Sequence, residues 1–287
     1  MQKELTMAYK SIFAPLTHFD SNSAALAYST AITDAHDAHD AHLEVLCLGV
    51  DRAPNTYYDA GSSAVLMHAA IEEAHAHADE MHNGVLKQLA GSGLRWEIVN
   101  AVSTTASLGH SIALQARLSD LAIVGSPYGS PHQATQCLAL EGLLFEAACP
   151  TVIVPKGDHK ARPETIVIGW NESKESIRAI RSALPFLQAA ASVHVAIIDP
   201  PENGPDRSDP GGALAVFLAR HGVRCDIQVM TRQGERISDR LARHVTETGA
   251  DMLVMGGYGH SRFRGAVLGG ATRDMLEHST VPVLMAH

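Results

Sequence analysis

A glycine-rich segment near the C-terminal end of the chain has the residue types that bind phosphate groups. Glycines allow successive backbone N–H groups to face one anion, and a helix expected from residue 270 adds the positive end of its dipole. Arginine and hydroxyl side chains in the segment can add charge and hydrogen bonds. The candidate contact residues are Gly256, Gly257, Gly259, His260, Ser261, Arg262, Gly269, Gly270, Ala271 and Thr272. Their spacing matches neither a Walker A loop nor the G-x-G-x-x-G motif.

Histidines form two further groups in the first half of the chain. They are His36, His39 and His42, and then His68, Glu72, His75, Asp79 and His82 along one long expected helix. Such spacing can bind transition metals, but it also fits the solvated face of a helix. The apolar stripe beside this face would consist of Met67, Ile71, Ala74, Ala78, Met81 and Val85. We predict the solvated face and no metal site, because no complete coordination set can be argued from the sequence.

An internal repeat organises the elements that must position the glycine-rich segment. Residues 119–129 resemble residues 250–259, and residues 150–155 resemble residues 282–286 at almost the same offset. Residues 11–16 likewise resemble residues 165–170. A near-constant offset over two pairs is difficult to obtain by chance, so the chain is interpreted as a duplication.

Each half alternates short apolar runs with amphipathic stretches. Strands are expected near 10–16, 43–50, 95–102, 121–125 and 151–155, and then at 165–170, 193–198, 224–230, 251–255 and 281–286. In the second half, helices are expected at 173–190, 213–221, 235–248 and 270–278, and Pro185 should kink or stop the first of them near Leu184. Strands separated by helices imply parallel pairing with right-handed crossovers. We therefore predict two tandem five-stranded, parallel, open α/β sheets of Rossmann-like type, in domains 1–156 and 163–287. Such sheets bind ligands at the carboxyl ends of their strands, beside the point where the strand order reverses.

Composition limits the classes of partner. The chain has 287 residues, of which 46% are hydrophobic and 18% charged, and its formal net charge is −9. An acidic balance argues against nucleic acid or an anionic membrane as the main partner. The apolar runs are too short for a transmembrane helix, and residues 1–10 do not resemble a secretory signal. Four scattered cysteines, Cys47, Cys137, Cys149 and Cys225, indicate reduced thiols, so we expect a cytoplasmic protein.

Several of these features together resemble the universal stress protein family. Gly256, Gly259 and Gly269 match the G-x-x-G-x9-G pattern of its ATP-binding members. The phrases "SDLAIVGSPYG", "ADMLVMGGYGHS", "CPTVIVP" and "VPVLM" are also typical of it, and the resemblance covers essentially the whole chain as two tandem domains. Gly270 stands where the family usually has Ser or Thr, and Asn171 stands where many nucleotide-binding members have Asp.

The resemblance implies an adenine nucleotide in the second domain: ATP, or AMP or ADP, with Mg²⁺ on the phosphates. Adenine and ribose would lie near the ends of the first two strands of that domain, at Gly169, Trp170, Asn171, Ile198 and Asp199. It also implies that the two domains pack through residues 151–154 and 283–286 as an intramolecular pseudo-dimer. A homodimer of whole chains stays open.

The corresponding loop of the first half is a poor phosphate cradle. Pro127 and Pro131 lack the N–H groups that would face an anion, and Ala139 replaces the last glycine of the pattern. The first domain is therefore expected to act as a scaffold.

The favoured function is a stress-response regulator that binds an adenine nucleotide and does not catalyse a reaction. The chain has no G-x-S-x-G elbow, no H-E-x-x-H motif and no cysteine with a recognisable histidine partner. Two alternatives stay open. One is an interaction scaffold without nucleotide, and the other is a slow ATPase or adenylating enzyme.

Overall fold

The computed structural model describes residues 8–36, 40–52, 63–200, 209–257 and 270–287. The chain divides into two compact units. One unit is Lys10–Cys149, and the other is Pro150–His287 together with the segment that ends at Tyr9. No helix in the described ranges combines the length and the apolar character needed to cross a membrane.

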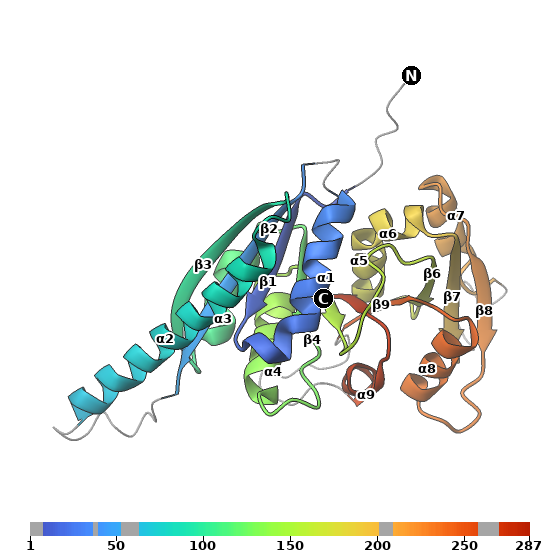
Figure 1. The fold of residues 1–287 in the computed structure, drawn as a ribbon. Helices are drawn as coiled ribbons and strands as arrows, with labels where there is room; N and C mark the ends of the chain where they lie inside the picture. The colour runs from blue at the N-terminus through green and yellow to red at the C-terminus, as the bar shows by residue number, and fades with distance from the viewer. Residues whose placement is uncertain (1–7, 37–39, 53–62, 201–208, 258–269) are drawn as a thin grey trace. The chain divides into compact units, whose positions relative to one another are not determined.

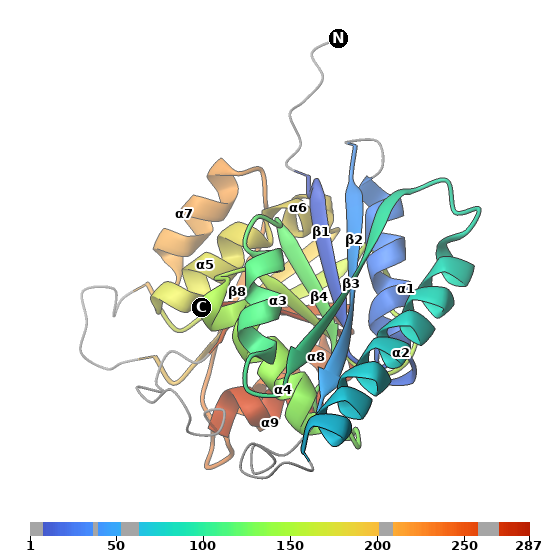
Figure 2. The same cartoon turned by 90° about the vertical axis from the view of Figure 1, so that its left-hand side faces the viewer.

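The first unit is a parallel sheet covered by helices on both faces. Its strands are β1 (Ser11–Leu16), β2 (His42–Asp51), β3 (Arg95–Thr104) and β4 (Leu121–Gly125), in the order β3-β2-β1-β4. Helices α1 (Phe19–His36) and α2 (Ser63–Leu89) cover one face, while α3 (Leu108–Ala116) and α4 (Gln133–Glu141) lie on the other (Figures 1 and 2). A short π-helical turn, Gly142–Glu146, continues α4. Because both faces are covered, the central strands are almost wholly apolar, as in residues 12–16.

The second unit repeats this strand order and has two further strands, β10 and β5, at one end. Its strands are β5 (Thr151–Val154), β6 (Thr165–Gly169), β7 (Ser192–Ile198), β8 (Asp226–Met230), β9 (Met252–Gly256) and β10 (Val283–Ala286). The strand order is β8-β7-β6-β9-β10-β5. The first five strands of that order are parallel, and β5 pairs antiparallel with β10, with Val283 opposite Ile153. The predicted open parallel α/β fold is confirmed, and the segments expected to meet, 151–154 and 283–286, form this antiparallel pair.

The helices of the second unit agree closely with the predicted ones. They are α5 (Lys174–Ser182), α6 (Leu184–Ala189), α7 (Gly212–Arg220), α8 (Ile237–Glu247) and α9 (Gly270–His278). The expected interruption near Leu184 is confirmed as the junction of α5 and α6 at Ala183. Pro185 lies in the first turn of α6, where its missing N–H group leaves no helical hydrogen bond unmade.

A duplicated aspartate fixes the start of the first strand of each unit. The Asp120 Oδ2 atom accepts hydrogen bonds from the backbone N–H groups of Lys10 and Ser11, at 2.8 and 3.0 Å. In the second unit, Asp251 Oδ2 accepts them from Glu164 and Thr165, at 2.9 and 3.1 Å. Each aspartate precedes the strand that lies beside the strand it holds. We call these two groups the aspartate clamps.

The clamp at Asp251 is electrostatic as well as geometric. Burial alone would raise the pKa of Asp251, but the Thr165 and Glu164 N–H groups and the Lys160 ammonium stabilise the carboxylate, so its pKa lies below the usual value. The Lys160 Nζ atom is 3.2 Å from Asp251 Oδ1. The charged form of Asp251 is thus the form that holds β6.

A glycine pair sets the distance between α3 and the end of α4. A Cβ atom at Gly142 would overlap the backbone of Gly109 and lie 2.8 Å from its Cα atom. A side chain at position 142 would separate the two backbones, so close packing requires glycine there, whereas a Cβ atom at Gly109 would lie 3.6 Å from the Gly142 Cα atom.

The substitution Asp251→Asn should lower the free energy of unfolding of the second unit by about 2 kcal/mol at pH 7, because hydrogen bonds to a charged acceptor are lost. The folded-state pKa is lowered, so this stabilisation is present above the unfolded pKa of about 3.9 and disappears as the pH falls below it. Urea titrations at pH 7 and pH 3 should therefore show a smaller difference at pH 3. Asp226→Asn, at an exposed carboxylate that makes no ion pair with any described residue, is the control. An equal loss at both pH values would contradict the electrostatic clamp.

Gly142→Ala should destabilise the first unit by about 2 kcal/mol, because the added methyl group overpacks the contact with Gly109. Thermal unfolding measures the effect. Gly270→Ala is the matched control, since a Cβ atom there meets no heavy atom within 4 Å. Equal melting temperatures for the two variants would show that the α3 contact has room to move.

Candidate functional site

The carboxyl ends of the strands of the second unit bring the predicted contact residues to one edge. The strand order reverses between β6 and β9, which is where open α/β sheets bind ligands. Trp170 N–H donates to Ala196 O at 3.0 Å, and Asp199 N–H donates to Met230 O at 2.9 Å. These hydrogen bonds extend the pairing of β6, β7 and β8 past the strand ends. Trp170 and Ile198 are half-buried there, whereas the side chains of Asn171 and Asp199 are exposed.

Asn171 and Ser173 build the entry to α5. The Asn171 side-chain oxygen accepts the Ser173 N–H at 3.2 Å, and Ser173 Oγ caps the helix by accepting the Ser176 N–H at 3.1 Å. Glu172 between them has a φ of 60°. A non-glycine residue in this left-handed region is held by its surroundings, so the turn that presents Asn171 is closely specified.

Asp199 makes two contacts with Arg232, an arginine that the sequence analysis did not identify as a site residue. Its Oδ1 atom accepts the Arg232 backbone N–H at 3.1 Å, and its Oδ2 atom lies 3.0 Å from Arg232 Nε. The φ of Asp199 is 45°, again in the left-handed region. The carboxylate is therefore fixed at the edge, with Arg232 beside it.

Among the described glycines of the predicted site, some are required by close packing, and one has space around its Cα atom. A Cβ atom at Gly256 would lie 2.5 Å from Ser176 N, and one at Gly169 would lie 3.2 Å from Leu241 Cδ2. Both glycines thus allow helices to approach the strand ends. Gly257 is buried and its N–H donates to Ala286 O at 3.1 Å, so that N–H does not face an anion. At Gly270, in contrast, an added Cβ atom meets no heavy atom of a described residue within 4 Å.

Three further residues of the predicted phosphate site, Gly270, Ala271 and Thr272, lie in the first turn of α9. Ala271 follows Gly270 in this helix, and Thr272 is 7% exposed. Gly259, His260, Ser261, Arg262 and Gly269 lie outside the described residues. Of the predicted phosphate site, the structure therefore describes the N-terminus of α9 but not the glycine-rich loop before it.

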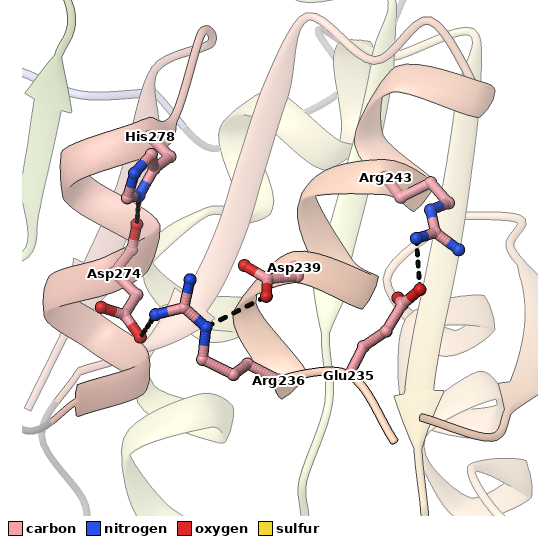
Figure 3. Close-up of polar contacts among 6 residues, drawn as sticks. All are labelled: Glu235, Arg236, Asp239, Arg243, Asp274 and His278. Carbon is pink, nitrogen blue, oxygen red and sulfur yellow. Dashed lines mark hydrogen bonds and ion pairs between the residues drawn. The ribbon is translucent and has the colours of Figure 1, made fainter. Parts of the chain in front are cut away.

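An arginine network joins α8 to α9 (Figure 3). Arg236, the residue before α8, donates from Nε to Asp239 at 3.0 Å and from Nη1 to Asp274 at 2.9 Å. Asp274 lies in α9, where its backbone oxygen accepts His278 Nδ1 at 2.8 Å. Hydrogen bonds and the charges of Asp239 and Asp274 raise the pKa of Arg236. Figure 3 also shows a separate pair, in which Arg243 of α8 donates to Glu235, a residue that precedes this helix.

Two arginines therefore reach this edge, and each is matched by aspartate: Arg232 by Asp199, and Arg236 by Asp239 and Asp274. Sequence reasoning missed both arginines. The sequence feature that could have identified them is the segment Thr231–Arg236. It places two arginines and a glycine directly after the third strand of the repeat, at the carboxyl edge of the sheet. The arrangement suits a polar or anionic ligand that exchanges contacts with these pairs.

The predicted histidine groups make local polar contacts. His68 lies 3.4 Å from Glu72, and Asn100 on β3 joins His82 Nδ1 at 2.9 Å and Asp79 at 2.8 Å. Across the described ranges, His, Cys, Asp and Glu form no group of three or more arranged to hold a metal ion. His39 lies outside the described residues. The apolar face of α2 is buried from Ala74 onward, but Ile71 is 41% exposed, so the expected stripe is wrong in the first turns of the helix, where only its later part contacts the core.

Comparison with known proteins identifies a family whose sequences resemble the second unit. The sequence model of the universal stress protein family matches residues 163–287. The universal stress protein Slr1230 of Synechocystis sp. is 26% identical over 145 residues, which are 50% of this chain and 49% of that protein. The chain thus spans about half the length of this curated relative.

Solved structures share the fold over nearly the full chain. A universal stress protein from Archaeoglobus fulgidus superposes with a TM-score of 0.66 at 14% identity, covering 96% of this chain and 97% of that one. A candidate universal stress protein from Pseudomonas aeruginosa gives 0.59 at 17% identity, covering 96% and 92%. These structural similarities show the fold of the chain. The match to the family model concerns the second half of the chain alone. Residues 163–287 therefore form a domain of the universal stress protein family.

Proposed function

We propose that the unit 150–287 binds an adenine nucleotide, ATP or alternatively AMP or ADP, at the carboxyl edge of its sheet, and that occupancy of this site regulates the protein in a stress response. The observation that carries the proposal is the open α9 N-terminus at Gly270, directly after a G-x-x-G-x9-G segment and beside the reversal of strand order. Helix N-termini favour anions, since unpaired N–H groups and the helix dipole both face the ligand. Mg²⁺ would accompany the phosphates.

The nucleoside part has groups to meet at the ends of β6 and β7. Trp170 offers a half-buried ring, and Asn171 offers an exposed amide whose oxygen already accepts the Ser173 N–H. The amide NH2 of Asn171 can donate to a ligand. At the end of β7, the fixed carboxylate of Asp199 is positioned to accept from ribose hydroxyls in exchange for part of its contact with Arg232.

Binding can alter the surface of the unit through Arg236. This arginine lies between Asp239 of α8 and Asp274 of α9, and its side chain is 61% exposed. A phosphate group arriving at the α9 N-terminus would compete with the two carboxylates for the guanidinium. The link between α8 and α9 would then differ between the empty and the occupied site, which is the change that a partner protein can read.

We propose binding rather than turnover. Three of the carboxylates described at this edge, Asp199, Asp239 and Asp274, are each held by an arginine. None of them is free to accept a proton from an attacking water. In this proposal the first unit serves as the scaffold, hydrolysis of ATP is slow and incidental, and assembly into homodimers is a separate property.

Gly270→Asp should weaken ATP binding at least tenfold relative to Gly270→Asn, because the added negative charge lies beside the phosphates while the size of the side chain is the same. A Cβ atom at this position meets no heavy atom of a described residue within 4 Å, and aspartate at a helix N-terminus stabilises the helix, so loss of folding does not explain the difference. Isothermal titration calorimetry with ATP, AMP and ADP measures the affinities. Equal affinities for the two variants would contradict the site. A wild-type chain that binds none of the three nucleotides would contradict the function.

Gly270→Ser should strengthen ATP binding about fivefold, since a hydroxyl bonded to phosphate contributes roughly 1 kcal/mol. Gly270→Ala is the matched control, because it removes the glycine without adding the hydroxyl. The melting temperature without nucleotide separates improved helix capping from improved binding. Serine and alanine variants of equal ATP affinity would show that no phosphate reaches this position.

A further inference from the structure

Four basic side chains meet at the carboxyl edge of the sheet in the unit 10–149. His18 follows β1, Arg52 follows β2, and His132 precedes α4 in the connection from β4. His77 comes from α2. The sequence places these residues far apart, and neither predicted histidine group contains any of them. We call them the basic cluster.

His18 is the centre of the basic cluster and holds one defined tautomer. Its side chain is buried, with 7% exposure, and its Nε2 atom lies 2.6 Å from Arg52 Nη2. Because a guanidinium only donates, His18 Nε2 is the acceptor, and the proton resides on Nδ1, which lies 3.2 Å from Thr17 Oγ1. Burial, followed by the charges of His132, Arg52 and His77, lowers the pKa of His18 to about 3. The ring is therefore neutral and orients the guanidinium.

Two further imidazole rings surround His18. His132 stacks on it with ring centroids 3.4 Å apart and planes 10° apart, and His77 meets it edge-on with centroids 5.3 Å apart. His132 is the N-cap residue of α4, yet its ring caps no backbone N–H of that helix. Burial, Arg52 and His77 also lower the pKa of His132. One helical turn later, Gln136 is 5% exposed, and neither of its side-chain polar atoms has a hydrogen-bond partner among the described residues.

The positive charge of the basic cluster has no counter-charge in the described part of the unit. Arg52 makes no ion pair with a described carboxylate, whereas Arg95 of the same unit pairs with Asp40 at 2.8 Å. The charges that act on His18 and His132 come from arginine and histidine. A metal ion does not fit, because the neighbouring guanidinium repels cations and stacked rings do not direct their nitrogen atoms to a common point.

We propose that the unit 10–149 contains a second ligand site in which Arg52, His77 and His132 bind a phosphate group, with His18 as the residue that positions Arg52. The guanidinium matches phosphate oxygens with two parallel N–H groups, and imidazole N–H groups add further donors. The N-terminus of α4 lies at the same place and favours an anion. The proposal is independent of the nucleotide site in the other unit. The phosphate belongs either to inorganic phosphate or to a small phosphate monoester.

This site accounts for the prolines in the corresponding loop of the first unit. Pro127 and Pro131 remove backbone N–H groups that a glycine-rich loop would supply. Side-chain donors from three separate segments, at Arg52, His77 and His132, take the place of those backbone donors. The first unit thus exchanges one way of holding an anion for another.

Titration of the full-length chain with inorganic phosphate and with glycerol phosphate, followed by calorimetry, tests the site. Arg52→Gln should weaken binding of the preferred ligand at least tenfold, because it keeps an amide NH2 group as a donor but shortens the side chain and removes the charge. Arg95→Gln is the matched control, since this exposed arginine of the same unit is already paired with Asp40. It should bind as the wild type does. Unchanged binding by Arg52→Gln, or no binding of either ligand by the wild type, would overturn the proposal.

Nitrogen-15 spectra of the histidine rings give a second readout that does not depend on the variants folding. Addition of the bound ligand should shift the ring signals of His77 and His132 and leave those of His194 and His221, in the other unit, unchanged. Shifts confined to the other unit would place the phosphate elsewhere and overturn the proposal.

Discussion

Both units depend on a carboxylate that holds the start of a central strand. Asp120 and Asp251 occupy the same position in the two repeats, and each accepts two backbone N–H groups of the neighbouring first strand. This contact fixes β1 against β4, and β6 against β9, at their amino ends. Since parallel strands then run in register, the same contact determines which residues meet at the carboxyl ends. The carboxyl edge, at which we propose that ligands bind, is therefore defined from the opposite end of the sheet.

The two units use this common framework for different chemistry. In the second unit, arginines at the edge are paired with aspartates, and an open helix N-terminus is left beside them. In the first unit, arginine and histidines gather without a described carboxylate. Duplication thus preserved the strand order and the clamp, while the residues after the strands diverged.

Much of the fold could be predicted from the sequence, but the sites could be predicted only in part. Buried strands such as residues 121–125 are continuous apolar runs, and Pro185 marks a helix junction through its fixed backbone. Gly256, in contrast, was interpreted as a ligand contact, and the structure shows that close packing against α5 requires it. Arg232 and the basic cluster were missed, because sheet topology unites residues that no spacing in the sequence connects.

The pairing of β5 with β10 has a consequence for how the repeats can be separated. The family match begins at residue 163, after β5, so a fragment cut there would lack the strand that covers β10. Val283, Leu284 and Met285 are buried, and their strand would become an exposed apolar edge, which is the template on which sheets of other molecules add. A fragment cut at the sequence boundary of the second repeat would therefore expose this edge. The edge strand of the second unit, β5, lies at the end of the first repeat in the sequence. The boundary between the sequence repeats and the boundary between the compact units therefore fall on opposite sides of β5.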